Sequence, residues 1–175
     1  SVEDKMNYQI AKDLPPNIMQ AMGLTEILKV PIEPCGGEKL SCYNNVRRYL
    51  KMHEGTIQFG WTFSQLGNIV FKANAHVVVK NECGEFLCVT PPEHQVSSIC
   101  FAPDDGVSQL INSERLPAKI FSLVEDEVVN KYVKLENLFS QMRLEGNLIG
   151  IDYINHEKYL LSSKLKAVYE KYGEP

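Results

Sequence analysis

Long hydrophobic runs and clusters of like charge are missing from this chain. Its 175 residues include 18 Lys and Arg against 22 Asp and Glu, which gives a net charge of −4 at pH 7. Because no block of basic residues occurs, we expect no general binding to nucleic acid or to an anionic membrane surface. No apolar run reaches the ~20 residues that a membrane-spanning helix needs, so no membrane segment is expected.

Closely paired cysteines are also missing. The five cysteines lie at positions 35, 42, 83, 88 and 100, and no two of them have C-x-x-C spacing. This pattern argues against a zinc ribbon, a redox motif and a disulfide scaffold, and it favours reduced thiols in a cytoplasmic protein. The chain begins with Ser and without a signal-peptide pattern, which leaves a removed leader, secretion or delivery elsewhere open.

Internal repeats and Gly/Ser-rich linkers are absent, and 44% of the residues are hydrophobic. A chain of this length and composition is typical of one globular domain, here residues 1–175. We expect its core over residues 35–101. Helical segments at about residues 1–34 and 120–173 are expected to cover that core.

The hydrophobic periodicity predicts an α+β fold, in which a helix bearing a cysteine packs on an antiparallel sheet and further helices follow at the C-terminal end. The expected helices and strands follow in chain order: helices 17–28 and 41–53; strands 56–63, 69–72, 75–80, 85–90 and 98–101; helices 125–144 and 157–172.

Cys42 and His76 form the first candidate pair for chemistry. Cys42 lies in the first turn of the expected helix 41–53, where unpaired backbone N–H groups and the helix dipole favour a thiolate. His76 lies on the expected strand 75–80 and would give such a thiol a base. A small buried cysteine and an unrelated strand histidine would show the same spacing.

Short motifs around this pair resemble a family of uncharacterised bacterial proteins. The motifs are the Cys-x-x-Asn-Val run at residues 42–46, Gly60-Trp61, the His segment 75–78 and Val-Thr-Pro at 89–91. The family's order of Cys on a helix, His on a strand and Asp on the next strand is similar to the core of the transglutaminase-like and papain-like cysteine hydrolases. Over residues 35–105 the resemblance implies that Cys42 attacks an amide of a peptide or protein, that His76 carries the proton, and that no cofactor is needed.

The chain departs from that pattern at the third position, where Cys88 stands in place of the acidic residue. The turn at residues 81–84 predicts a hairpin register that pairs position 81 with 85 and His76 with Thr90. In that register Cys88 is the diagonal neighbour of His76 on the same face of the sheet. Cys88 or Thr90 would then orient the imidazole, less well than a carboxylate does.

Three further residues are weaker candidates for substrate or oxyanion contacts. The amides of Asn45 and Gln58 would supply hydrogen-bond donors, and Trp61 would line a groove, although such residues also serve as caps, surface groups and core. A zinc site is a separate possibility, since four residues within nineteen positions are of zinc-binding types: His76, Cys83, Cys88 and His94. Their spacing lacks the close pairs of structural zinc sites, so we expect no metal.

The sequence therefore supports three functions of different classes. The first is a thiol-dependent hydrolase or acyltransferase that acts on an amide bond through a Cys–His pair. The second is a catalytically inactive papain- or transglutaminase-like domain that binds a peptide or protein. The third and least favoured is a zinc-binding structural domain. Neither the substrate nor the oligomeric state follows from the sequence.

Overall fold

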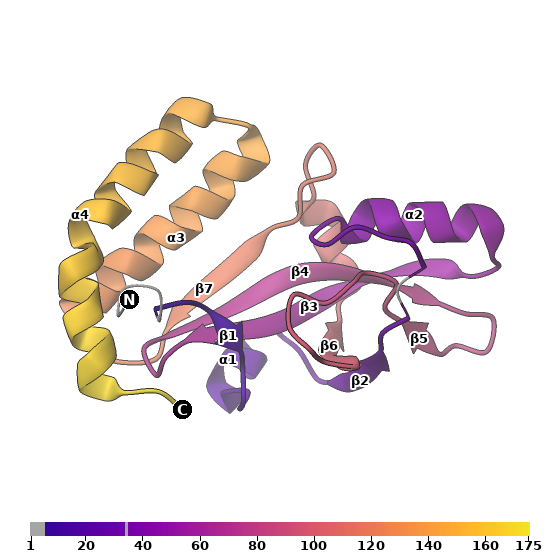
Figure 1. Ribbon diagram of the computed structural model, residues 1–175, viewed down its shortest axis with the longest axis horizontal. Coiled ribbons are helices and arrows are strands. Elements are labelled where there is room, and N and C mark those ends of the chain that lie inside the picture. Colours follow the sequence, from indigo (N-terminus) through magenta and orange to yellow (C-terminus); the bar gives the residue numbers. More distant parts are fainter. Residues whose placement is uncertain (1–5, 34) are drawn as a thin grey trace. The chain divides into compact units, whose positions relative to one another are not determined.

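The computed structural model describes residues 6–33 and 35–175, and the chain divides into two compact units (Figure 1). Unit 1 contains the N-terminal residues as far as Ile18, Phe63–Asn74 and Ile111–Pro175. Unit 2 contains Met19–Thr62 and Ala75–Leu110. Two long strands pass through both units, and the prediction of a single domain stays a prediction.

Unit 2 contains one long helix, a short 3-10 helix and a largely antiparallel set of strands. Its strand order is β2-β6-β3-β4-β5. Its elements are β2 (Leu28–Pro31), α2 (Cys42–Met52), the first part of β3 (Thr56–Leu66), the second part of β4 (Val70–Lys80), β5 (Phe86–Leu87), β6 (Ser98–Pro103) and the 3-10 helix η2 (Asp105–Leu110).

The hairpin between β4 and β5 has the predicted register. Val79 pairs with Leu87 and Lys80 pairs with Phe86, as expected if position 76 is opposite position 90. The Asn81 side chain fixes the turn by accepting hydrogen bonds from the backbone N–H groups of residues 83 and 85, both at 2.9 Å. Gly84 supplies the positive φ of 81° that the turn needs.

β5 ends at Leu87, three residues before the end of the predicted strand 85–90, because the chain then turns toward β2. The Cys88 backbone N–H donates to the Pro31 carbonyl at 2.9 Å, and Glu33 N–H donates to the Cys88 carbonyl at 2.8 Å. Ile32 and Cys88 thereby form a parallel bridge. This bridge holds Cys88 in the apolar core of unit 2, with Val30, Val78 and Phe101.

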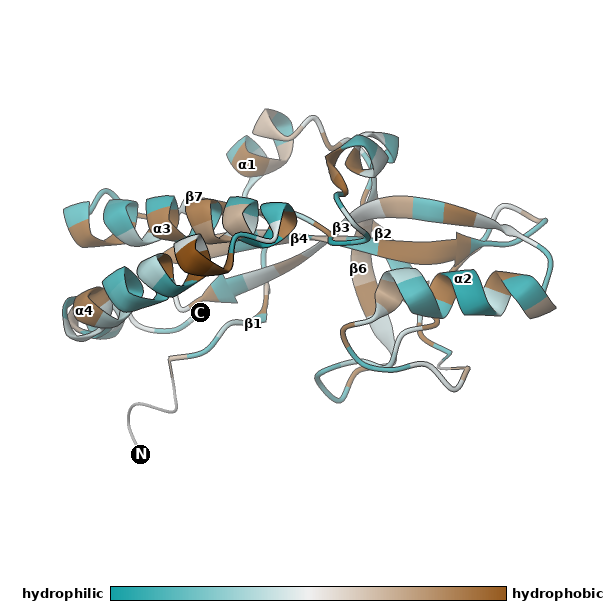
Figure 2. Ribbon diagram, turned by 90° about the horizontal axis from the view of Figure 1, so that it is seen from above, coloured by the Kyte–Doolittle hydropathy of each residue, from teal (hydrophilic) through white to brown (hydrophobic). Residues whose placement is uncertain are grey.

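The cysteine-bearing helix forms as predicted. α2 runs from Cys42 to Met52 and buries Cys42, Asn45 and Val46. Figure 2 shows hydrophilic and hydrophobic bands along this helix, as expected for a helix with one buried face. Ser41 precedes the helix, but its side chain makes no capping hydrogen bond.

Unit 1 contains the end of β3, the start of β4 and the two C-terminal helices. β1 (Gln9–Ile10) pairs with β3, and β7 (Ala118–Ser122) pairs with β4. Helix α3 (Glu127–Glu145) packs against both β7 and α4 (Leu148–Tyr172). Asp126 caps α3 by accepting hydrogen bonds from two backbone N–H groups, and Gly146 ends it in the left-handed conformation.

A buried carboxylate lies inside unit 1. Glu136 of α3 is 5% exposed and accepts a hydrogen bond from the Tyr8 hydroxyl at 2.9 Å. Lys158 of α4 pairs with the same carboxylate, and Lys72 Nζ of β4 lies 3.9 Å from it. The Glu136 carboxylate of α3 thus links this helix to the segment that carries Tyr8, to β4 and to α4.

Several predicted boundaries are wrong. The helix predicted at 17–28 is α1 (Pro16–Ala21), which is followed by Gly23 at φ 71°, and β2 starts at Leu28. The strands predicted at 69–72 and 75–80 form the single strand β4. The last helix starts nine residues earlier than predicted, at Leu148 and not at Glu157.

The α+β class is confirmed, with an antiparallel seven-stranded sheet and helices at the C-terminal end. A papain-like core remains a hypothesis. None of the helices in the described part of the chain is long and apolar enough to cross a membrane.

Candidate functional site

Cys42 is the first residue of α2 and only 7% exposed. The backbone N–H of Val77, the residue after His76 on β4, donates to the thiol, and the N–H groups of Cys42 and Tyr43 also lie close to it. Burial outweighs these donors and raises the pKa of Cys42 to about 11, with a smaller contribution from nearby Cys88. The backbone N–H groups at the helix N-terminus thus favour the thiolate as expected, but burial opposes them more strongly.

His76 contacts Cys88 as the hairpin register predicted. The ring Nε2 lies 3.4 Å from Cys88 Sγ, and that sulfur lies 3.7 Å from the Thr90 carbonyl oxygen. Phe101 meets the imidazole edge-on, with ring centroids 6.3 Å apart. Burial lowers the pKa of His76 to about 4, so the ring is neutral at pH 7.

The other ring nitrogen of His76 faces a different environment. Among the described residues, every buried side-chain nitrogen and oxygen has a hydrogen-bond partner. Nδ1 has no hydrogen-bond partner among the described residues, so this nitrogen is not completely sealed, although burial dominates the environment of the ring. His76 thus presents Nε2 to a buried thiol.

Cys42 and His76 are not hydrogen-bonded to each other in the described part of the chain. Cys42 instead accepts from Val77 N–H, which places the thiol beside the strand segment that carries the histidine. The structure therefore brings Cys42, His76 and Cys88 into one region of unit 2. The shifted pKa values of Cys42 and His76 keep the thiol and the imidazole neutral at pH 7.

Thr90 and Asn45 form a buried network beside this region. Asn45 Nδ2 donates to the Thr90 hydroxyl at 3.0 Å and to the Glu38 carbonyl at 2.7 Å, while Oδ1 accepts from Glu38 N–H at 3.0 Å. Both amide protons of Asn45 are therefore engaged, and in this conformation neither is available to an oxyanion. Asn45 instead ties the loop before α2 to the segment that carries Cys88 and Thr90.

The sequence analysis missed this network, although one signal for it was present. A Cβ on Gly37 would lie 2.7 Å from Asn45 Cγ, so the loop can pass this side chain only with glycine at position 37. The consecutive glycines before the helix, Gly36 and Gly37, mark this close approach.

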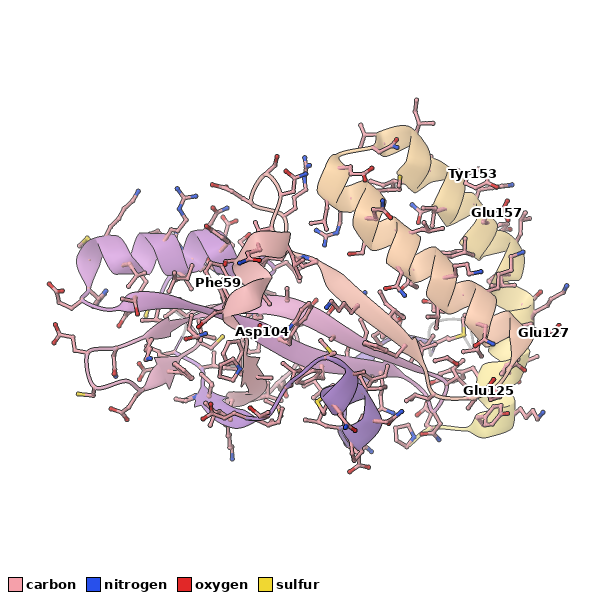
Figure 3. All side chains as sticks on the ribbon, turned by 180° about the vertical axis from the view of Figure 1, so that it is seen from behind. Phe59, Asp104, Glu125, Glu127, Tyr153 and Glu157 are labelled. Atoms are coloured by element: carbon pink, nitrogen blue, oxygen red, sulfur yellow. The ribbon has the colours of Figure 1, made fainter. Side chains whose placement is uncertain are left out.

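The amide of Gln58 and the indole of Trp61 form hydrogen bonds with residues that directly follow β6. Gln58 Nε2 donates to Asp105 Oδ1 at 2.9 Å and to the Phe59 carbonyl at 2.8 Å. Trp61 is fully buried, and its Nε1 donates to Asp104 Oδ2 at 2.9 Å. Figure 3 labels Phe59 in this part of β3 and Asp104 in the turn before η2. These contacts join β3 to the turn before η2.

No group of three or more His, Cys, Asp or Glu side chains in residues 6–33 and 35–175 is arranged to hold a metal ion. Of the four residues considered for zinc, His76 contacts Cys88, whereas Cys83 is exposed in the hairpin turn.

Comparisons of the chain with protein-family models, with curated proteins and with solved structures find no match. The proposals below therefore rest on the residues themselves.

Proposed function

We propose that the chain is a thiol-dependent hydrolase or acyltransferase that acts on an amide bond, with Cys42 as nucleophile and His76 as base. The observation that carries this proposal is the proximity of the two side chains to shared neighbours: the N–H of Val77, next to His76 on β4, approaches the Cys42 thiol, and Cys88, which lies near Cys42, contacts His76 Nε2 at 3.4 Å. Cys88 would then take the place of the acidic residue that orients the imidazole in the cysteine hydrolases that the sequence resembles, and Thr90 would support it through its carbonyl oxygen.

The neutral state of both groups determines how such a reaction would start. With the pKa of Cys42 near 11 and that of His76 near 4, a resting thiolate–imidazolium pair is strongly uphill. The proton would instead leave Sγ as sulfur bonds to the carbonyl carbon, and His76 would accept it. His76 would then return that proton to the leaving amine, and water would release the acyl group from sulfur.

The backbone offers the donors that this reaction needs. The N–H groups of Cys42 and Tyr43 are the unpaired donors of the first helical turn, and Val77 N–H approaches the thiol from β4. A carbonyl oxygen drawn toward these groups would be stabilised as negative charge develops. This leaves the side chains of Asn45 and Gln58 to their structural contacts.

A second candidate, a peptide- or protein-binding domain without activity, is favoured by one observation. The group that contacts His76 Nε2 is a neutral thiol, whose own pKa is raised by burial. A thiol stabilises an imidazolium much less than a carboxylate does, so the base is weak.

Acyl transfer to Cys42 separates the two candidates. The test uses a variant in which the exposed Cys35, Cys83 and Cys100 are replaced by Ser, so that Cys42 and Cys88 are the remaining thiols. On incubation with a peptide thioester, we expect one acyl adduct by intact mass, mapped to Cys42 and lost in Cys42→Ser.

The matched control replaces the base. Proton transfer by a positioned side chain contributes about 10²–10⁴-fold, so His76→Ala should slow acylation by at least ~100-fold. If the folded protein forms no adduct between pH 6 and 10, the acyl-transfer proposal is wrong and the binding domain is favoured.

A further inference from the structure

Helix α4 has one buried hydrophobic face and several large apolar side chains that are exposed elsewhere on the helix. The buried face consists of Ile154, Leu161, Leu165 and Tyr169. On the opposite face Ile149 is 85% exposed, Tyr153 is 64% exposed and Leu160 is 58% exposed. Large apolar side chains that are this exposed on one helix commonly mark an interaction surface.

The exposed residues follow a regular spacing. We define the outer stripe as the exposed residues that recur at alternating intervals of four and three positions: Ile149, Tyr153, His156, Leu160, Ser163 and Ala167. This is the spacing of the contact positions of a coiled coil, which keeps one side of a helix facing a partner helix. Figure 3 shows Tyr153 and Glu157 projecting from α4 on the side away from α3, and Figure 2 shows the hydrophobic start of α4.

The sizes of the side chains favour an antiparallel partner with the same sequence. The large residues Ile149 and Tyr153 lie in the first half of the stripe, and the small residues Ser163 and Ala167 lie in the second half. An antiparallel second copy places Ile149 opposite Ala167, Tyr153 opposite Ser163 and His156 opposite Leu160. A parallel copy would instead set large residues against large ones at one end and leave a gap at the other.

The charges beside the stripe agree with the same arrangement. Asp152 flanks the first half, whereas Lys164 and Lys166 flank the second. In the antiparallel register Asp152 lies opposite Lys166 of the second copy, and this pair occurs twice because the arrangement is two-fold symmetric. Side-chain size and charge thus specify the same register independently.

We propose that the chain forms a two-fold symmetric dimer through antiparallel pairing of the outer stripes of two α4 helices. The test is sedimentation velocity of the full chain over a range of concentrations from about 1 to 200 µM. We expect a monomer–dimer equilibrium in the parent protein and a monomer throughout for Leu160→Glu, which places a charge in the stripe.

The control is Leu148→Glu. Leu148 is also apolar and 72% exposed near the start of α4, but it lies outside the outer stripe. This variant should dimerise as the parent does. Because Leu148 and Leu160 are both exposed, neither change removes core packing, and circular dichroism should show unchanged helix content.

Charge reversal tests the partner and the register. Asp152→Lys and Lys166→Asp each turn two attractive pairs into repulsive ones, so each variant alone should dimerise about tenfold more weakly. An equimolar mixture of the two variants restores both pairs and should recover the parent affinity as a heterodimer. A parent protein that is monomeric at every concentration would overturn the proposal, as would a dimer that is unaffected by Leu160→Glu or a mixture that does not recover.

Discussion

The Cys88→Asp substitution places a carboxylate where a thiol sulfur now lies 3.4 Å from His76 Nε2. It therefore introduces the acidic residue that the resembled family has at this position. At a separation of about 4 Å and an effective dielectric constant of about 20, a carboxylate attracts an imidazolium by about 4 kcal/mol. That energy corresponds to a rise of about three in the pKa of His76, from its value of about 4 to about 7.

The cost of burying the new carboxylate would offset part of this rise in the pKa of His76. Cys88 is only 2% exposed, and a buried carboxylate has a substantial desolvation cost unless its partner is charged. We therefore expect a pKa of about 5 to 7 for His76 in Cys88→Asp, together with a lower free energy of unfolding. An imidazolium of that pKa would in turn lower the pKa of Cys42.

Alkylation of Cys42 by iodoacetamide at pH 6 measures this effect. In a background with Ser at positions 35, 83 and 100, we expect at least a tenfold faster reaction in Cys88→Asp than in the parent. Cys88→Asn, which has nearly the same shape as the Asp variant but no charge, should not accelerate the reaction, and His76→Ala should abolish the difference. Equal rates in a folded Cys88→Asp protein, with an unchanged His76 titration by NMR, would refute the reasoning.

Three further outcomes are expected from the same structure. The pKa of His76 is near 4 in the folded protein and about 6.5 in the unfolded chain, so the unfolded chain takes up a proton at higher pH than the folded protein does. The free energy of unfolding should therefore be greatest above about pH 6.5 and fall by at most about 3 kcal/mol as the pH decreases toward 4. Urea titrations of the parent and of His76→Gln over this pH range should show the difference. Asn45→Ala leaves Thr90 and Glu38 without their partner and should cost about 1–3 kcal/mol in urea unfolding, whereas the neighbouring Asn44→Ala should cost less. Glu136→Ala leaves two lysines beside an empty buried position and should cost about 3 kcal/mol, against little for the exposed Glu145→Ala.

The β4–β5 hairpin could be predicted from the sequence because its determinants are local. Asn81 and Gly84 fix the turn, and the turn then fixes which residues oppose each other for the following positions. The contact between His76 and Cys88, twelve positions apart, agrees with that register, although the bridge from Cys88 to Ile32 also holds Cys88 in place.

The start of α4 was missed because its first turn looks unfavourable in isolation. Gly150 usually weakens a helix, yet here a Cβ at this position would lie 2.6 Å from Met142 Sδ of α3. With glycine at this position, the Met142 side chain packs closely against α4, and Asn147 caps the helix by accepting from Gly150 N–H at 2.8 Å. That a helix begins here despite the glycine becomes clear only from its contact with Met142 of α3.

The protonation state of Cys42 could not be predicted from its place on the helix, because two effects of different range oppose each other there. The dipole at a helix N-terminus contributes about 0.3–1 kcal/mol at an exposed position, and it follows from the sequence once the helix is located. Burial has a larger effect, since it raises the pKa of the thiol to about 11, and it depends on how β4 and the rest of unit 2 cover the first turn. A Cys–His pair inferred from sequence thus identifies candidate residues, whereas their charge at rest depends on what else surrounds them. In this chain that makes position 88, which contacts the imidazole directly, the residue whose charge would change the state of the pair.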